Sequence, residues 1–270
     1  MNARSPADAR LLERFAHHVG RGINRFSMIG PGDRVLIGVS GGKDSLALSL
    51  ALVERRRWVP VDYELAAVQV EWLEYPMTDG ERRTIDRFYE ELGIPLNRIT
   101  ASIHPSWWKR GFSCYTCALN RKRLIFDEAA RLGFRTIALG HHLDDIAETT
   151  MINLFFRGEF STMMPVQRFF GGKVQIIRPM CEVRGAEVAR VARRLDLPAV
   201  PTRCPNAEKN RRGLMRDILR QVSRVDRNAA ANVYGAAWRI NRDYLPSGDE
   251  APAEPGAPEG EVEPRDGAGP

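Results

Sequence analysis

Short runs of aliphatic and β-branched residues alternate with helical segments along most of this chain, and that alternation most constrains its fold. The first run, Arg34 to Val39, follows a Pro-Gly turn and is typical of a buried strand. Strands alternating with helices of this length predict an α/β fold, a doubly wound parallel sheet of about five strands with helices on both faces. Further strands are predicted near residues 65–70, 98–103, 136–139 and 174–177, and the intervening helices at residues 46–57, 79–92, 116–132 and 145–156.

Helices are also predicted on either side of the sheet-forming region. Apolar residues at helical spacing indicate an amphipathic helix over residues 6–27, and two or three helices should lie between residues 184 and 244. The tail is rich in Pro, Gly and Glu with little to bury, so we predict that it is disordered. The expected divisions are an N-terminal helix (1–27), a main domain (28–225), a C-terminal helix (226–245) and the acidic tail (246–270).

The charge of the chain is unevenly distributed. The 270 residues carry a net charge of +6, but the tail has seven acidic residues against one arginine, which leaves +12 on the rest. A body this basic favours a polyanionic partner, most commonly nucleic acid, although a merely soluble arginine-rich protein has the same composition. We find no run of about 18 apolar residues and no signal pattern, so we expect no membrane partner and a cytoplasmic location.

A glycine-containing loop follows the first predicted strand and precedes a helix. Glycines let successive backbone N–H groups point at an anion, the helix N-terminus adds its positive end, and lysine and serine supply further donors. This is not the P-loop of kinases and GTPases, because Ile37 replaces its first Gly and Asp44 replaces its Ser or Thr. The pattern therefore predicts another kind of phosphate-binding loop, against the alternative of an ordinary Gly-Gly turn. The loop residues are Ser40, Gly41, Gly42, Lys43, Asp44 and Ser45.

A second polar loop, Gly140 to Asp145, follows the strand predicted at residues 136–139. Because ligands bind beyond the carboxyl ends of parallel strands, the two loops should face one crevice. Asp145 with Glu148 three residues later is typical of a helix cap, and we expect Gly140 and His141 to line the site. Two histidines beside two aspartates also fit a metal site, which is the alternative.

The four cysteines suggest metal or sulfur chemistry, since cytosolic thiols stay reduced. Cys114 and Cys117 open a predicted helix, and their spacing is a frequent half-site for zinc or an iron–sulfur cluster, though a redox pair shares it. Cys204 lies in a Pro-flanked loop that can reach the crevice, whereas Cys181 continues an apolar run and is predicted to be a core residue. Three thiolates would leave one iron of a 4Fe-4S cluster open for sulfur, while all four would close a zinc site.

Several stretches together resemble one known family. The loop SGGKDS at residues 40–45 resembles the signature of the PP-loop ATP pyrophosphatases, and GHHLDD with the following ET resembles a second signature that lysidine synthetases share. With CYTCALNRKRLIFDEAARLG, TIALGHHLDDIAETTMINLFFRGEF, IIRPM and PTRCPN, residues 15–225 are similar to the tRNA 2-thiocytidine synthetases of the TtcA family. The extra CxxC modules of the related thiouridine enzymes are missing, and residues 70–76 do not look like the family's polar loop.

The resemblance implies a PP-loop domain of the adenine nucleotide alpha hydrolase-like kind that adenylates a tRNA base and replaces its oxygen with sulfur, forming 2-thiocytidine at position 32. It implies ATP, Mg²⁺ and a 4Fe-4S cluster as cofactors, and tRNA with a cysteine-desulfurase-type sulfur donor as partners; family members are often dimers. It also implies that Cys114, Cys117 and Cys204 hold the cluster. Residues 40–45 would bind pyrophosphate, with Asp44 acting through magnesium or loop geometry. Gly140, His141 and Asp145 would lie beside the nucleotide.

Two basic stretches and an aromatic pair extend this prediction. Residues 121–123 and 209–212 are expected to hold the tRNA backbone, with a solvated helix face as an even alternative for the second. Trp107 and Trp108 are favoured as core residues over base-stacking ones. Two other functions stay open: an ATP-dependent ligase of the lysidine synthetase kind, which needs no cluster, and a zinc-bearing RNA-binding protein without ATP chemistry.

Overall fold

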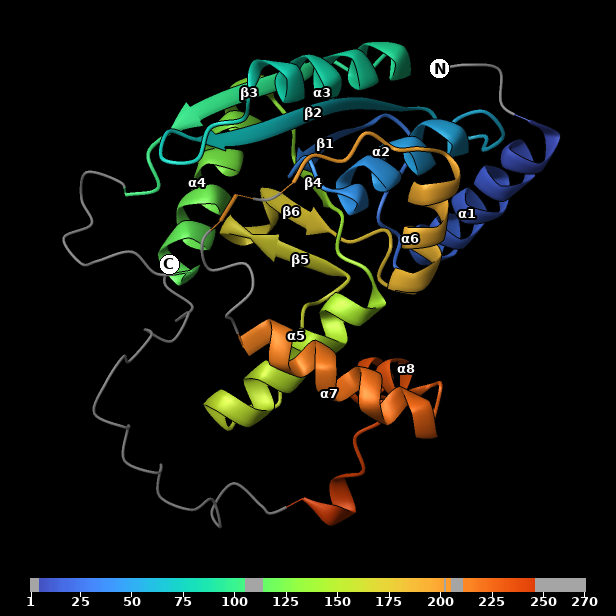
Figure 1. The fold of residues 1–270 in the computed structure, drawn as a ribbon. Helices are drawn as coiled ribbons and strands as arrows, with labels where there is room; N and C mark the ends of the chain where they lie inside the picture. The colour runs from blue at the N-terminus through green and yellow to red at the C-terminus, as the bar shows by residue number, and fades with distance from the viewer. Residues whose placement is uncertain (1–4, 105–113, 202, 205–210, 246–270) are drawn as a thin grey trace.

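A six-stranded sheet in the order β3-β2-β1-β4-β6-β5 forms the centre of the computed structural model, which describes residues 5–104, 114–201, 203–204 and 211–245 (Figure 1). Five strands run parallel, as predicted, and β5 pairs antiparallel with β6 at the edge. The expectation of about five strands therefore missed β5, whose sequence VQRF is half polar and only partly buried. The strands are β1 (Asp33–Val39), β2 (Tyr63–Trp72), β3 (Leu96–Ala101), β4 (Thr136–Leu139), β5 (Val166–Phe169) and β6 (Val174–Ile177).

Helices cover both faces of the sheet. Alternate residues of the strands point to opposite sides, so Val35 and Ile37 pack into one core and Leu36 into the other. The larger core receives α1, α2, α3 and α6, and the smaller one receives α4 through Ile125 and Ala129. The helices are α1 (Pro6–Arg25), α2 (Lys43–Arg55), α3 (Asp79–Leu92), α4 (Cys114–Leu132), α5 (Leu143–Arg157), α6 (Gly185–Arg194), α7 (Arg211–Val225) and α8 (Ala229–Ala236), with short 3-10 turns η1 (Phe170–Gly172) and η2 (Arg242–Tyr244).

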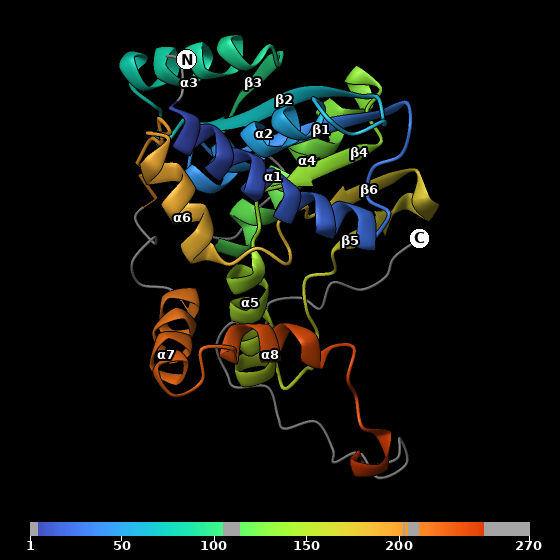
Figure 2. The same cartoon turned by 90° about the vertical axis from the view of Figure 1, so that its right-hand side faces the viewer.

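Three helices, α5, α7 and α8, form a group beside the sheet (Figure 2). The opening helix and the helices after residue 184 lie where the sequence predicts them. The tail at residues 246–270 and the pair Trp107-Trp108 lie outside the described residues. No helix in the part of the chain that the structure describes is long and apolar enough to cross a bilayer.

Candidate active site

The loop from Ser40 to Ser45 joins the carboxyl end of β1 to the first turn of α2. Gly41 has φ +79°, a left-handed conformation that favours glycine. The Ser40 hydroxyl accepts a hydrogen bond from the Gly42 N–H at 3.2 Å, and the Ser45 hydroxyl donates to the Gly42 carbonyl at 2.9 Å. The two serine hydroxyls, predicted as further donors to an anion, thus make hydrogen bonds within the loop and hold its shape.

The exposed part of this loop carries the charges. Lys43 Nζ lies 2.8 Å from Asp44 Oδ1, and both side chains are about one-third to two-fifths exposed. Gly42 is the N-cap residue of α2 and gives no side-chain hydrogen bond to the first N–H groups of that helix. Donors at a helix N-terminus with a lysine beside them form an anion site.

The second loop contacts the backbone of the first, so the two loops lie side by side, as predicted. A Cβ built on Gly140 would lie 3.0 Å from the carbonyl carbon and oxygen of Asp44 and from the nitrogen of Ser45. Only a residue without a side chain allows this approach. His142 continues the contact, with its Nε2 3.9 Å from Asp44 Oδ1.

Asp145 caps α5, but from a different position than predicted. His142 is the N-cap: its Nδ1 accepts from the Asp145 N–H at 3.4 Å, and the Asp145 carboxylate accepts from the His142 N–H at 3.0 Å. The predicted pair of Asp145 and Glu148 is therefore wrong in its register. Glu148 is buried and binds Arg216 of α7 instead, with an N–O distance of 2.9 Å.

His141 is an uncharged group within this loop. Burial, with a smaller contribution from the neighbouring positive charges of Arg178 and Arg212, lowers its pKa to about 3. Its Nδ1 is shielded from solvent and has no hydrogen-bond partner among the described residues. The ring is therefore neutral at physiological pH and contributes shape and dipole, not charge.

The three cysteines predicted to hold a cluster lie in one region of the structure. Cys114 and Cys117 occupy the first turn of α4, and Cys204 lies close enough to affect the Cys117 thiol electrostatically. Burial raises the pKa of Cys117, Arg121 opposes this, and the Cys204 and Cys114 thiols add to it. Over the described ranges no three potential ligands converge to metal-binding distance, so the three thiols are neighbours without forming a closed cage.

Cys181 lies apart from them in function. It is fully buried beyond β6, and burial raises the pKa of its thiol to about 11. A thiol held neutral in an apolar core is a packing residue, which confirms the predicted burial.

Trp72 is a feature of the cysteine region that the sequence did not reveal. It ends β2 within the stretch that departs from the family pattern, and its ring is 7% exposed beneath the Arg121 guanidinium at 5.5 Å. Its indole N–H slightly lowers the pKa of Cys117 but makes no hydrogen bond of normal geometry with any described residue. A buried donor left over beside a thiol suits an additional sulfur acceptor at that place.

The segment before Cys204 is attached to the phosphate loop. The Val200 N–H donates to the Gly41 carbonyl at 3.0 Å, and a Cβ on Gly41 would lie 2.6 Å from Val200 Cγ2. Arg203 binds Glu81 of α3 with an N–O distance of 2.9 Å. The cysteine region and the phosphate loop therefore belong to one site.

The predicted basic stretches have mixed surroundings. Arg121 and Lys122 lie over aromatic rings, and Arg123 pairs with Asp127 at 3.0 Å. Arg212 donates to Thr149 at 3.3 Å, so part of the second stretch supports α5 and is not free for a ligand. Lys209 and Asn210 lie outside the described residues.

Comparisons with known proteins agree with this geometry. The PP-loop domain model matches residues 14–222. The tRNA-cytidine(32) 2-sulfurtransferase of Pelobacter propionicus is 35% identical, over 87% of this chain and 88% of its own, and that of Syntrophotalea carbinolica is 34% identical, over 87% and 92%. Among solved structures, the U34-tRNA thiolase NcsA from Methanococcus maripaludis, with its 4Fe-4S cluster, shares the fold with a TM-score of 0.68 at 22% identity, covering 85% of this chain and 78% of that one.

Proposed function

We propose a function from the premise that the chain belongs to the PP-loop domain family, in the branch of the tRNA-cytidine(32) 2-sulfurtransferases. On that premise the protein is an ATP-dependent tRNA sulfurtransferase, and position 32 cytidine is its target base. The observation that carries the proposal is the hydrogen bond from Val200 to Gly41, because it joins the thiol segment to the phosphate loop. A ligase would need the phosphate loop alone.

The reaction we propose has two steps. The oxygen of the base attacks the α-phosphate of ATP, an O–P bond forms, and pyrophosphate leaves toward residues 40–45. Lys43 and the N-terminus of α2 stabilise the negative charge that develops on the phosphates. Sulfur then forms a bond to the activated carbon, the C–O bond breaks, and AMP leaves with the oxygen.

Cys114, Cys117 and Cys204 are the residues that would hold a 4Fe-4S cluster, and their neighbouring thiols fit it. When bound, the cluster would supply an iron without a protein ligand, at which sulfur can be carried. The chain's own part is to keep these thiols beside the phosphate loop through Val200 and Arg203, and to offer the Trp72 N–H to a sulfur acceptor.

The remaining partners follow from the same premise. We infer that Asp44 would help to hold Mg²⁺, which would neutralise charge on the polyphosphate, and that Gly140, His141 and Asp145 line the nucleotide side of the crevice. A cysteine-desulfurase-type donor would supply sulfur, and a homodimer is the expected assembly. Residues 28–225 would be the catalytic domain, and the acidic tail would lie outside it.

The test is mass spectrometry of nucleosides from total tRNA of a deletion strain. We expect 2-thiocytidine to disappear and to return with wild type and with Cys181→Ala, but not with Cys114→Ser or Asp44→Ala. Survival of every thionucleoside in the deletion strain would contradict the proposal. Iron content of the purified protein separates it from the ligase, which needs no cluster, and from the zinc-bearing RNA-binding protein.

A further inference from the structure

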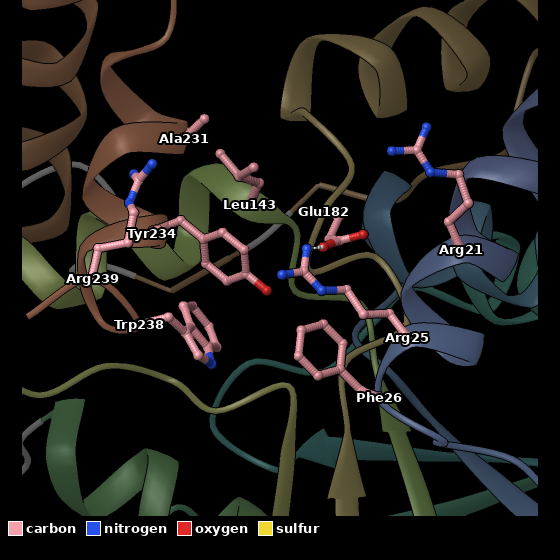
Figure 3. A pocket seen from close by; sticks show the side chains of 10 residues that line it. Arg21, Arg25, Phe26, Leu143, Glu182, Ala231, Tyr234, Trp238 and Arg239 are labelled. Carbon is pink, nitrogen blue, oxygen red and sulfur yellow. Dashed lines mark hydrogen bonds and ion pairs between the residues drawn. The ribbon is translucent and has the colours of Figure 1, made fainter.

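A pocket of about 360 Å³ lies between the end of α1 and the end of α8, and Cys114, Cys117 and Cys204 are not among the residues that line it (Figure 3). Its floor includes Leu143, the first residue of α5, which follows Gly140 by three residues. The Cα atoms of these two residues are therefore at most about 11 Å apart. The second loop thus contributes to the pocket through Leu143 and contacts the phosphate loop through Gly140.

Positive charge dominates the pocket. Three guanidinium groups line it, those of Arg21, Arg25 and Arg239, against one carboxylate, Glu182. Glu182 is already paired with Arg25. Neither Arg21 nor Arg239 has an ion pair or side-chain hydrogen bond with another residue in the described ranges. The pocket is therefore complementary to a ligand that carries negative charge.

Aromatic rings form its other wall. Trp238 is 45% exposed, with its ring centroid 4.8 Å from Tyr234 at an interplanar angle of 61° and 6.2 Å from Phe26 at 39°. Two neighbouring rings thus fix the indole while nearly half of it stays accessible. Figure 3 shows the Tyr234 hydroxyl pointing toward Arg25 and Glu182. Tyr234 is only 7% exposed; its hydroxyl lies beside the buried Cys181 thiol and interacts with it, although no hydrogen bond of normal geometry forms with any described residue.

We propose that this pocket binds one unstacked nucleotide of the RNA substrate, with its base against Trp238 and its phosphate beside Arg21 and Arg239. An aromatic platform beside arginines is the arrangement by which proteins hold unpaired bases. The volume is at the lower end of ligand pockets, so it admits one nucleotide and not a helix.

The position of the pocket favours a nucleotide within RNA over a free one. The inference rests on the proposed function: an RNA whose target base enters the crevice passes the second loop, and Leu143 places the pocket on that loop. Contacts of this kind fix the register of the RNA, whereas the reacting groups act on another nucleotide.

The experiment measures the affinity of unmodified tRNA for the full-length wild-type protein and for three variants. These are Trp238→Ala, Trp238→Phe and a double variant that combines Arg21→Ala with Arg239→Ala. Base stacking contributes about 1–3 kcal/mol, so Trp238→Ala should raise Kd about five- to 150-fold, and Trp238→Phe should keep most of the affinity. The double arginine variant should lower the salt slope of log K by about one to two. The matched controls are Trp58→Ala and Arg190→Ala, and neither should change Kd. Trp58 is 38% exposed and stacks on His17, and Arg190 is an exposed residue of α6.

The outcomes separate this inference from the proposed function. Failure of the wild-type protein to bind tRNA would contradict the proposed function itself. Wild-type binding with unchanged affinity in Trp238→Ala and Trp238→Phe would overturn the pocket proposal alone. A change of sedimentation from dimer to monomer in Trp238→Ala, at equal tRNA affinity, would assign the pocket to a second copy instead. Saturation by cytidine monophosphate as tight as by tRNA would assign it to a free nucleotide.

Discussion

Gly140→Ala is the sharpest test of the contact between the two loops. The added Cβ would stand 3.0 Å from three backbone atoms, two of Asp44 and one of Ser45. Backbone atoms cannot rotate away as the end of a flexible side chain can. Gly140 is not among the residues with positive φ, so the substitution adds no strain of backbone conformation and its effect is steric.

The size of the effect follows from this distance. Ordinary carbon contacts begin at about 3.5 Å, so the loops must separate by roughly 0.5 Å. Overpacking of this kind costs about 1–3 kcal/mol of folding stability. A displacement of 1 Å at a group that positions substrate can reduce the rate about 100-fold, so we expect a loss of roughly 10- to 100-fold in thiolation.

The assay pairs ATP affinity by titration calorimetry with the turnover of 2-thiocytidine formation and the thermal midpoint. Gly80→Ala in the first turn of α3 is the matched control, because the nearest atom to its added Cβ is the Thr78 hydroxyl at 3.9 Å. Wild-type ATP affinity and turnover in Gly140→Ala would refute the rigid contact. Equal losses in Gly80→Ala would show that the effect is not specific to the loops.

Three further predictions follow from the same site. Cys181→Ala should keep the iron content and lose about 1 kcal/mol of stability, because Cys181 is a buried packing residue. Cys114→Ser should lose iron. Colorimetric iron analysis of both variants distinguishes a three-cysteine iron–sulfur site from a four-cysteine zinc site. Between pH 6.5 and about 3, His141 binds a proton in the unfolded protein but not in the folded one. The free energy of unfolding should therefore fall by up to about 1.4 kcal/mol per pH unit as the pH decreases through this range. The His141→Asn variant should show a flatter pH dependence in urea titrations. Glu148→Gln should cost about 1–2 kcal/mol in denaturant unfolding, less than a fully buried pair, because Arg216 is partly exposed.

Strand β1 could be predicted from sequence because its apolar run is buried on both faces and bounded by a turn. Strand β5 could not, since its burial alternates weakly and its partner lies across a short turn at an edge. The N-cap of α5 was also predicted at the wrong residue. Asp is a common N-cap residue, so the pattern favoured Asp145, and only the structure assigns the N-cap to His142.

The sequence predicted which loops lie near one another, but not the individual contacts between distant segments. Nothing in the letters around Val200 indicates that its N–H reaches Gly41, and no periodicity marks Trp72 as the neighbour of Cys117. Gly41 and Trp72 lie at the carboxyl ends of the neighbouring parallel strands β1 and β2, and the segments that contact them come from elsewhere in the chain. Motif spacing could identify the thiols and the phosphate loop separately, but not what joins them.

That junction gives the third cysteine a definite place. The segment before Cys204 is attached to the phosphate loop through Val200, and helix α7 after it is attached to α5 through Arg216 and Glu148. Helix α5 begins at the second loop, so the described segments before and after Cys204 are each attached at or next to one of the two loops. A change in either loop should therefore alter the thiol site as well as nucleotide binding, and iron retention in Gly140→Ala reports that coupling directly.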